Sequence, residues 1–261
     1  MEHLLVTLCT YNVSENLPRL LTRIREVVPE ADILVVDDAS PDGTGKIADE
    51  WVARDSQVHV KHRQGKLGLG TATVAAFQFG IDRGYSFLVN LDADFSHSPE
   101  KIPQLLSLMD QCDVAIGSRY VTGGEIHGWK PIRHVMSRGV NCLSRFMLGL
   151  SPRDTSGSFR CYRVDLLRKI NFGQIVSKGY AFEEEILYRC HQAGARFLET
   201  PIRFEDRRAG QSKINMREVG RALRDLGILG VENWRSPRQP QEKCGAQPQH
   251  DKSNANTPDA H

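Results

Sequence analysis

Short apolar runs alternate with segments of helical period through the first half of the chain. The runs lie at residues 4 to 8, 33 to 36, 58 to 62 and 87 to 91. Between them, apolar side chains recur at helical spacing over residues 17 to 28, 47 to 53 and 71 to 83. Apolar strands separated by helices are typical of a mostly parallel sheet covered by helices on both faces. We therefore expect an α/β fold.

The second half of the chain is less regular. Its patterns predict strands at residues 114 to 116 and 196 to 204, and helices at residues 134 to 148 and 182 to 193. Residues 236 to 261 are polar and hold almost no large apolar side chains, so burial cannot offset the entropy of ordering them. We expect one folded domain over residues 1 to 235 and a disordered polar tail over residues 236 to 261.

Polar side chains follow three of the predicted strands where each strand ends. They are Thr10 to Asn12, Asp37 with Asp38, and Asp92 to Asp94. In parallel α/β sheets, ligands bind outside the carboxyl ends of the strands. The sequence therefore predicts that these three clusters meet at one ligand site.

The two carboxylates of Asp92 and Asp94 allow two interpretations. Residues i and i+2 at a strand end can converge on one divalent cation, which prefers oxygen ligands. Alternatively, Asp94 and Ser96 stand before Pro99, where acids and hydroxyls cap a helix N-terminus. From the residues alone the two interpretations have about equal support.

The composition excludes several classes of protein. The net charge of the 261 residues is only +2, which gives no electrostatic case for a nucleic-acid partner. The six cysteines form no CxxC pair and no zinc-type spacing. No apolar run approaches the roughly 20 residues of a membrane span. We expect a soluble or peripheral protein with reduced cysteines.

Several motifs resemble glycosyltransferase family 2. The first three lie at residues 9 to 17, 35 to 44 and 92 to 97. Later motifs at residues 117 to 120, 137 to 139, 155 to 160, 177 to 185 and 206 to 213 are similar to those of the polyprenyl-phosphate (dolichyl-phosphate) mannose synthases within that family. The resemblance runs in consistent order from about Leu4 to Ile214.

This resemblance implies a fold, a reaction and a metal ion. The fold is the GT-A nucleotide-sugar-binding fold, and the reaction moves mannose from GDP-mannose to the phosphate of a membrane polyprenol, with inversion at the anomeric carbon. The implied metal ligands are Asp92, Asp94 and Ser96. They would hold Mg²⁺ or Mn²⁺ against the charge of the leaving diphosphate.

The resemblance also implies which residues bind the donor. Asp38 would accept hydrogen bonds from the nucleotide, Tyr11 would line the same pocket, and Arg119 would bind phosphate oxygens through its fork. The implied donor-binding residues are Cys9, Tyr11, Val36, Asp38, Asp92, Ala93, Arg119, Arg207 and Lys213. The implied catalytic residues are Asp94, Arg119 and Glu185.

For the acceptor phosphate, the resemblance implies Arg133, Ser137 and Lys213. A phosphate monoester has a second pKa of about 6 and is mostly dianionic at neutral pH. The nucleophile therefore needs little proton removal, so positioning carries more of the catalysis than a general base. Glu185 stands where many family members carry an acid near the acceptor. An orienting role, an electrostatic role and a solvated helix acid all stay open for it.

This chain departs from the family pattern at three positions. Cys9 replaces the usual proline and Val13 replaces the usual acid, which weakens the expectation for the donor base. Ser96 stands where some members carry glutamine as a metal ligand. A hydroxyl, or a water bound to it, would complete the shell more weakly.

Residues 216 to 234 predict a helix with an apolar stripe and arginines on another face. The stripe consists of Val219, Ala222, Leu223, Leu226 and Leu229. Such a helix either lies in a lipid interface or packs on the domain. We expect a peripheral protein on the cytoplasmic face of a membrane, and the resemblance allows a membrane partner subunit.

Two other functions are open at this stage. One is a family 2 enzyme with another donor or acceptor, such as UDP-glucose or a lipid or polysaccharide hydroxyl. The other is a catalytically silent protein that binds sugar nucleotides.

Overall fold

The computed structural model of the 261-residue chain describes residues 3–177, 179, 181–206 and 216–235. The predicted polar tail lies outside the described residues. So do Arg207 and Lys213, which were predicted to bind phosphate groups.

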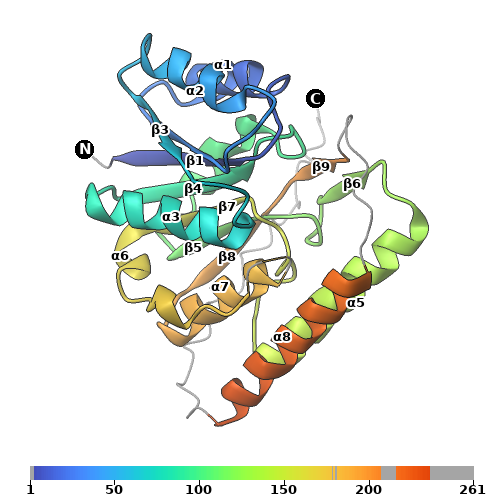
Figure 1. Ribbon diagram of the computed structural model, residues 1–261. Helices are drawn as coiled ribbons and strands as arrows, with labels where there is room; N and C mark the ends of the chain where they lie inside the picture. Colours follow the sequence, from blue (N-terminus) through green and yellow to red (C-terminus); the bar gives the residue numbers. More distant parts are fainter. Residues whose placement is uncertain (1–2, 178, 180, 207–215, 236–261) are drawn as a thin grey trace, which may run out of the picture.

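A seven-stranded sheet in the order β3-β2-β1-β4-β7-β5-β8 forms the centre of the molecule (Figure 1). Its strands are β1 (Leu4–Thr10), β2 (Asp32–Asp37), β3 (Val58–His62), β4 (Phe87–Asp92), β5 (Val114–Ser118), β7 (Arg160–Arg163) and β8 (Phe197–Pro201). Neighbouring strands are parallel except at β7, which is antiparallel to both β4 and β5. The prediction of a mostly parallel sheet is confirmed.

Helices cover both faces of this sheet (Figure 1). They are α1 (Leu17–Val27), α2 (Thr44–Val52), α3 (Leu69–Asp82), α4 (Ile102–Leu106), α6 (Val164–Leu167) and α7 (Phe182–Gln192), with short 3₁₀ turns at Pro99–Lys101 and Phe172–Gln174. Consecutive residues of β1 enter different cores, because Leu5 packs with α3 and α7 whereas Val6 packs with α1. Burial on both faces explains why these strands are apolar without alternation.

The second half departs from the predicted elements. The predicted strand at residues 196 to 204 is two strands in different sheets: β8, and β9 (Arg203–Glu205), which pairs with β6 (Glu125–His127). The strands β6 and β7 were not predicted. The reason is local, because β7 reads Arg-Cys-Tyr-Arg and β6 is only three residues long, so neither forms an apolar run.

Two long helices, α5 (Pro131–Leu148) and α8 (Met216–Arg235), lie side by side at one edge of the molecule (Figure 1). Asn233 Nδ2 donates to Met147 O at 3.0 Å. Leu226 and Leu229 of the predicted apolar stripe are only 1% and 0% exposed, so this part of α8 packs on the domain. No helix within the described ranges is long and apolar enough to cross a bilayer.

Candidate active site

The carboxyl ends of β1, β2 and β4 bring six of the nine predicted donor-binding residues to one edge of the sheet: Cys9, Tyr11, Val36, Asp38, Asp92 and Ala93. Cys9 is in register with Val36 on one side and with Asp92 on the other. At the same edge, the backbones of Asn12, Ala39 and Phe95 adopt φ angles of 57°, 55° and 61°. Left-handed backbone is uncommon for residues other than glycine, and such strain clusters at functional sites. Each of the three polar clusters therefore contains or adjoins a strained turn.

Two neighbouring acids, Asp37 at the end of β2 and Asp38 directly after it, make different contacts. The Asp37 carboxylate is occupied by contacts within the protein: it accepts hydrogen bonds from Thr10 Oγ1 at 3.0 Å and from Ser40 N at 3.0 Å. Asp38 is 5% exposed and pairs with Arg63 Nη1 at 2.6 Å. Its Oδ2 accepts from the backbone nitrogens of Leu67 and Gly68. Asp38 thus anchors the loop between β3 and α3, and its Oδ1 keeps capacity for a further donor.

The turn after β4 tests the helix-cap interpretation of Asp94. Asp94 Oδ1 accepts from Ser96 N at 3.0 Å, closing a tight turn that passes through the left-handed Phe95. The following 3₁₀ turn begins after Ser98 and has no side-chain cap. The helix-cap interpretation is therefore wrong. The Asp94 carboxylate belongs to the strand end together with Asp92.

The chemistry around this turn fits a divalent cation. Ser96 Oγ and His97 Nδ1 are buried and have no hydrogen-bond partner within the described residues. His97 Nδ1 lies 3.9 Å from Asp92 Oδ2, and burial lowers the pKa of His97. The described residues contain no group of three or more His, Cys, Asp or Glu side chains arranged for a metal. The carboxylate oxygens of Asp92 and Asp94 and the hydroxyl of Ser96 would suit Mg²⁺ or Mn²⁺ if the ion took its other ligands from water and a diphosphate.

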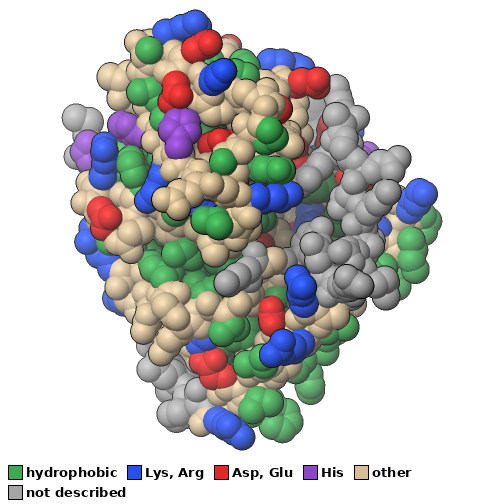
Figure 2. All heavy atoms as spheres, viewed as in Figure 1, with side chains coloured by type: hydrophobic (Ala, Val, Ile, Leu, Met, Phe, Trp, Pro, Cys, Tyr) green, Lys and Arg blue, Asp and Glu red, His purple; other side chains and the backbone are tan. Residues whose placement is uncertain are grey.

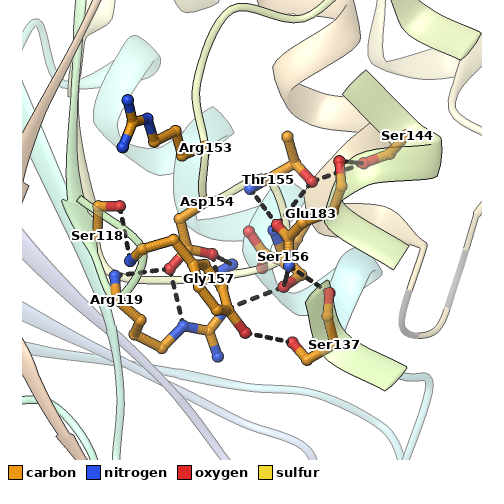
Figure 3. Close-up of polar contacts among 12 residues, drawn as sticks. Ser118, Arg119, Ser137, Ser144, Arg153, Asp154, Thr155, Ser156, Gly157 and Glu183 are labelled. Atoms are coloured by element: carbon orange, nitrogen blue, oxygen red, sulfur yellow. Dashed lines mark hydrogen bonds and ion pairs between the residues drawn. The ribbon is translucent and has the colours of Figure 1, made fainter. Parts of the chain in front are cut away.

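Arg119 is held by a carboxylate that sequence reasoning did not assign to the site. Its Nε and Nη2 bind Asp154 Oδ2 and Oδ1 at 2.8 and 2.7 Å (Figure 3). The side chains of Arg119 and Asp154 are only 6% and 0% exposed. Burial alone would raise the pKa of Asp154, but the Arg119 guanidinium lowers it below its ordinary value. Within the described part of the chain, the Arg119 side chain makes its hydrogen bonds through Nε and Nη2 and none through Nη1.

The loop that carries Asp154 is fastened to α5. Asn141 Oδ1 accepts from Thr155 N at 2.6 Å and from Ser156 N at 3.2 Å. Ser144 Oγ and Thr155 Oγ1 lie 2.6 Å apart (Figure 3). The position of the Arg119 guanidinium is therefore set from two sides, by β5 and by α5.

Two of the residues predicted for the acceptor phosphate, Arg133 and Ser137, lie near the same arginine, and the third, Lys213, is outside the described residues. Arg133 and Arg119 both face the Trp129 ring, at 4.1 and 5.6 Å from its centroid. Ser137 Oγ accepts from the hydroxyl of Tyr120 at 2.7 Å. Arg133 Nη1 also donates to Asp206 Oδ1 at 2.9 Å. The structure thus gathers Arg119, Arg133 and Ser137 at one place.

Glu185 is fully buried, so its interpretation as a solvated helix acid is wrong. Its carboxylate accepts from the backbone nitrogens of Val176 and Ser177 and pairs with Arg189 at 3.2 Å. This geometry favours the orienting role, because the carboxylate holds the segment before α7 rather than standing free.

The neighbouring Glu183 is buried as well. It pairs with the fully buried Arg160 at 3.0 Å, and Arg160 Nη2 donates to Thr155 O at 2.7 Å. This pair joins the start of α7 to the Asp154 loop.

Sequence reasoning therefore missed four supporting residues: Arg63, Asp154, Arg160 and Glu183. Arg63 directly follows a strand end, Asp154 directly precedes the motif at residues 155 to 160, and Arg160 is the last residue of that motif, so their positions were a usable signal for these three. Nothing local distinguished Glu183 from a surface acid.

Comparison with known proteins decides the family. The sequence profile described as Glycosyl transferase family 2 matches residues 5–171, which contain Asp38, Asp92, Asp94, Arg119 and Asp154. The chain belongs to glycosyltransferase family 2. The predicted family is confirmed.

Two relatives of this family 2 enzyme match along most of their length. The undecaprenyl-phosphate mannosyltransferase of Micrococcus luteus is 46% identical over 225 residues, which span 86% of this chain and 90% of that protein. The polyprenol monophosphomannose synthase of Mycolicibacterium smegmatis is 44% identical over 234 residues, which span 88% of each.

Solved structures agree with the GT-A fold. A mannosyltransferase from Pyrobaculum calidifontis in complex with GDP-Man and Mn²⁺ has a TM-score of 0.61 at 14% identity, covering 91% of this chain and 66% of that one. Glucosyl-3-phosphoglycerate synthase from Mycobacterium tuberculosis in complex with Mn²⁺, UDP and its product has a TM-score of 0.61 at 17% identity, covering 91% and 81%. The predicted GT-A fold is confirmed.

Glu184 gives the stability of this family 2 enzyme a pH dependence. It is 2% exposed, and burial raises its pKa from the ordinary 4.5 to about 8. The folded state holds this proton more tightly than the unfolded state. The contribution of Glu184 to the free energy of unfolding is therefore fully present below pH 4.5 and is lost as the pH rises towards about 8.

We expect Glu184→Gln to remove that loss, making the variant more stable than the wild type at pH 8 by up to a few kcal/mol. Urea unfolding at several pH values measures this difference. The exposed Glu50→Gln serves as the matched control and should leave the slope unchanged. Parallel pH profiles for wild type and Glu184→Gln would show that Glu184 is ionised in the folded state.

Proposed function

We propose that this enzyme is an inverting mannosyltransferase that moves mannose from GDP-mannose to the phosphate of a polyprenol, at the cytoplasmic face of a membrane. The observation that carries the proposal is the similarity, over most of each chain, to two proteins named for polyprenyl-phosphate mannosyl transfer. In the reaction, the bond from the anomeric carbon to GDP breaks. A bond from that carbon to a phosphate oxygen of the polyprenol forms on the opposite face.

At the donor end, Asp94 and Asp92 would hold Mg²⁺ or Mn²⁺, with Ser96 beside them. Such an ion, when bound, offsets the negative charge that develops on the leaving GDP. Asp38 is held in place by Arg63 and would accept a hydrogen bond from the nucleotide through Oδ1. Cys9, Tyr11, Val36 and Ala93 would form the wall of the donor pocket. Arg207 and Lys213 remain proposed phosphate ligands.

At the acceptor end, the proposed task is to hold a dianion. Arg119 and Arg133 face one Trp129 ring, and Ser137 lies within hydrogen-bond reach of the adjacent Tyr120 hydroxyl. Fixed arginines orient a phosphate through paired hydrogen bonds. Because a phosphate monoester is already mostly ionised at neutral pH, orientation of its attacking oxygen matters more than proton removal. Glu185 acts as a positioning residue through the segment before α7.

A radioactive transfer assay tests this function. The purified full chain is supplied with Mg²⁺ or Mn²⁺, detergent-dispersed polyprenyl phosphate, and either labelled GDP-mannose or labelled UDP-glucose. We expect a mild-acid-labile labelled lipid from GDP-mannose and none from UDP-glucose. Label from UDP-glucose alone would overturn the donor assignment, and no labelled lipid from either donor would overturn the proposed reaction.

A further inference from the structure

A basic hollow opens on the flank of α5. Its volume is about 390 Å³ and its lining includes Arg119, Arg138, Arg145 and Arg153. Arg119 is neutralised by Asp154, but the other three are exposed and form no side-chain hydrogen bond or ion pair within the part of the chain that the structure describes. Figure 3 shows the Arg153 guanidinium turned away from the Asp154 network. Three uncompensated cations therefore share one hollow.

A carboxylate beside Arg153 is already engaged by the backbone. Glu199 accepts from the backbone nitrogens of Arg153 and Asp154 at 2.8 and 3.0 Å. The Glu199 carboxylate therefore binds the backbone of this loop and not the Arg153 guanidinium. Like charges gathered without partners repel one another, so such a cluster gains free energy when an anion binds.

An apolar stripe runs along α5 next to these arginines. The exposed side chains Ile132, Val135, Met136, Leu143 and Phe146 recur at spacings of three, four and seven residues. Val135 and Phe146 are 66% and 78% exposed. The buried side of the helix carries Asn141, Ser144 and Leu148, so neither the stripe nor the arginines face the core. Figure 2 shows hydrophobic side chains with Lys and Arg side chains among them along the lower right, where Figure 1 places α5 and α8.

We propose that these two features form one docking surface for an anionic phospholipid bilayer. We call it the α5 docking surface and define it as Arg138, Arg145 and Arg153 together with Ile132, Val135, Leu143 and Phe146. The arginines would bind phosphodiester headgroups, and the apolar stripe would enter the boundary of the acyl chains. This inference rests on the proposed function, because a polyprenyl acceptor is presented at a bilayer surface.

The same surface accounts for the orientation of the enzyme on the membrane. Arg138 lies one residue after Ser137, and Arg119 lines the basic hollow as well as the acceptor site. Docking through α5 would thus bring the acceptor site to headgroup level. Residues 216 to 234 were expected either to lie in a lipid interface or to pack on the domain. The burial of Leu226 and Leu229 shows that this side of α8 packs on the domain.

Vesicle sedimentation of the full chain tests the docking surface. Vesicles of phosphatidylcholine alone are compared with vesicles of phosphatidylcholine and phosphatidylglycerol in equal parts. Each arginine near an anionic surface contributes about fivefold to binding, so Arg138→Gln, Arg145→Gln and Arg153→Gln together should weaken binding to the anionic vesicles about a hundredfold. Added salt should weaken wild-type binding in the same direction. Phe146→Ser should weaken it further without affecting the fold.

The matched control removes three exposed cations from elsewhere: Arg54→Gln, Arg168→Gln and Lys169→Gln, which follow α2 and α6. This control should bind the anionic vesicles within about threefold of wild type. Equal losses in both triple variants would overturn the proposal, as would unchanged binding of the α5 variant. Calorimetry with inorganic pyrophosphate distinguishes a lipid headgroup from a free anion. Tight pyrophosphate binding that the α5 variant loses, without any vesicle binding by wild type, would overturn a lipid site.

Failure of docking is distinguishable from failure of the proposed reaction. With detergent-dispersed acceptor, the α5 triple variant should retain wild-type transfer, because no bilayer is involved. If wild type itself made no mannolipid but bound anionic vesicles through α5, the reaction would be overturned and the docking surface upheld. Transfer lost in detergent by the α5 triple variant alone would overturn docking as the role of these arginines.

Discussion

Asp94→Asn is expected to lower mannosyl transfer by about a thousandfold while leaving the fold intact. Asparagine keeps the shape of the side chain and can still accept the hydrogen bond from Ser96 N, which closes the turn at 3.0 Å. What it removes is the negative charge that would hold a divalent cation against the diphosphate. Loss of one preorganised electrostatic contact to a leaving group costs about 10² to 10³ in rate, and loss of a metal costs more.

The matched control for Asp94→Asn is Asp110→Asn, at an exposed position after α4. Both variants should unfold at the wild-type urea concentration, and only Asp94→Asn should lose activity. Titration with Mn²⁺ in the presence of GDP-mannose should show weaker metal binding for this variant alone. Full turnover by Asp94→Asn at ordinary metal concentration would contradict the assignment of Asp94 as a metal ligand.

Asp154→Asn is expected to destabilise the folded protein by about 3 to 5 kcal/mol, because it leaves the buried Arg119 guanidinium without its partner. Arg119 and Asp154 are joined by two side-chain bonds and one backbone bond. Thermal unfolding measures the loss. Asp165→Asn is the control, since the Asp165 carboxylate is 83% exposed and its pair with Arg168 contributes less than about 1 kcal/mol.

A double variant separates stability from chemistry at this pair. Arg119→Met with Asp154→Leu replaces both charges by apolar groups and should recover most of the lost stability, because no uncompensated charge remains. Transfer should stay at least about a hundredfold below wild type, since the phosphate-facing cation is gone. If the double variant recovered transfer along with stability, Arg119 would be a purely structural residue.

The first half of the fold was predictable because its elements leave local patterns. Strands β1, β2 and β4 are buried on both faces, and their sequences are therefore continuous apolar runs. The helices α1 and α3 repeat apolar residues at helical spacing. The second half was less predictable. The strand β7 is stabilised by pairing with β4 and β5, 68 or more residues of chain away from β4, and nothing in Arg-Cys-Tyr-Arg signals that pairing.

The candidate site was likewise predictable from the sequence only in part. Motifs located Asp92, Asp94, Arg119, Arg133 and Ser137 without knowledge of the fold. They did not reveal that Arg63 holds Asp38 or that Asp154 holds Arg119. They also left Glu185 open between a solvated acid and an orienting one, because exposure is a property of packing and not of residue type.

By itself, the sequence determined the order of strands and helices in the first half of the chain, the family, and the acids at the end of β4. These features follow from local periodicity and from short motifs whose residues are neighbours in the chain. Only the tertiary structure decided that Asp94 closes a strained turn instead of capping a helix. It also decided that Arg119 is fixed by a buried carboxylate and that the exposed apolar stripe lies on α5. Those outcomes depend on contacts between residues far apart in the chain, whose desolvation and pairing no local pattern records.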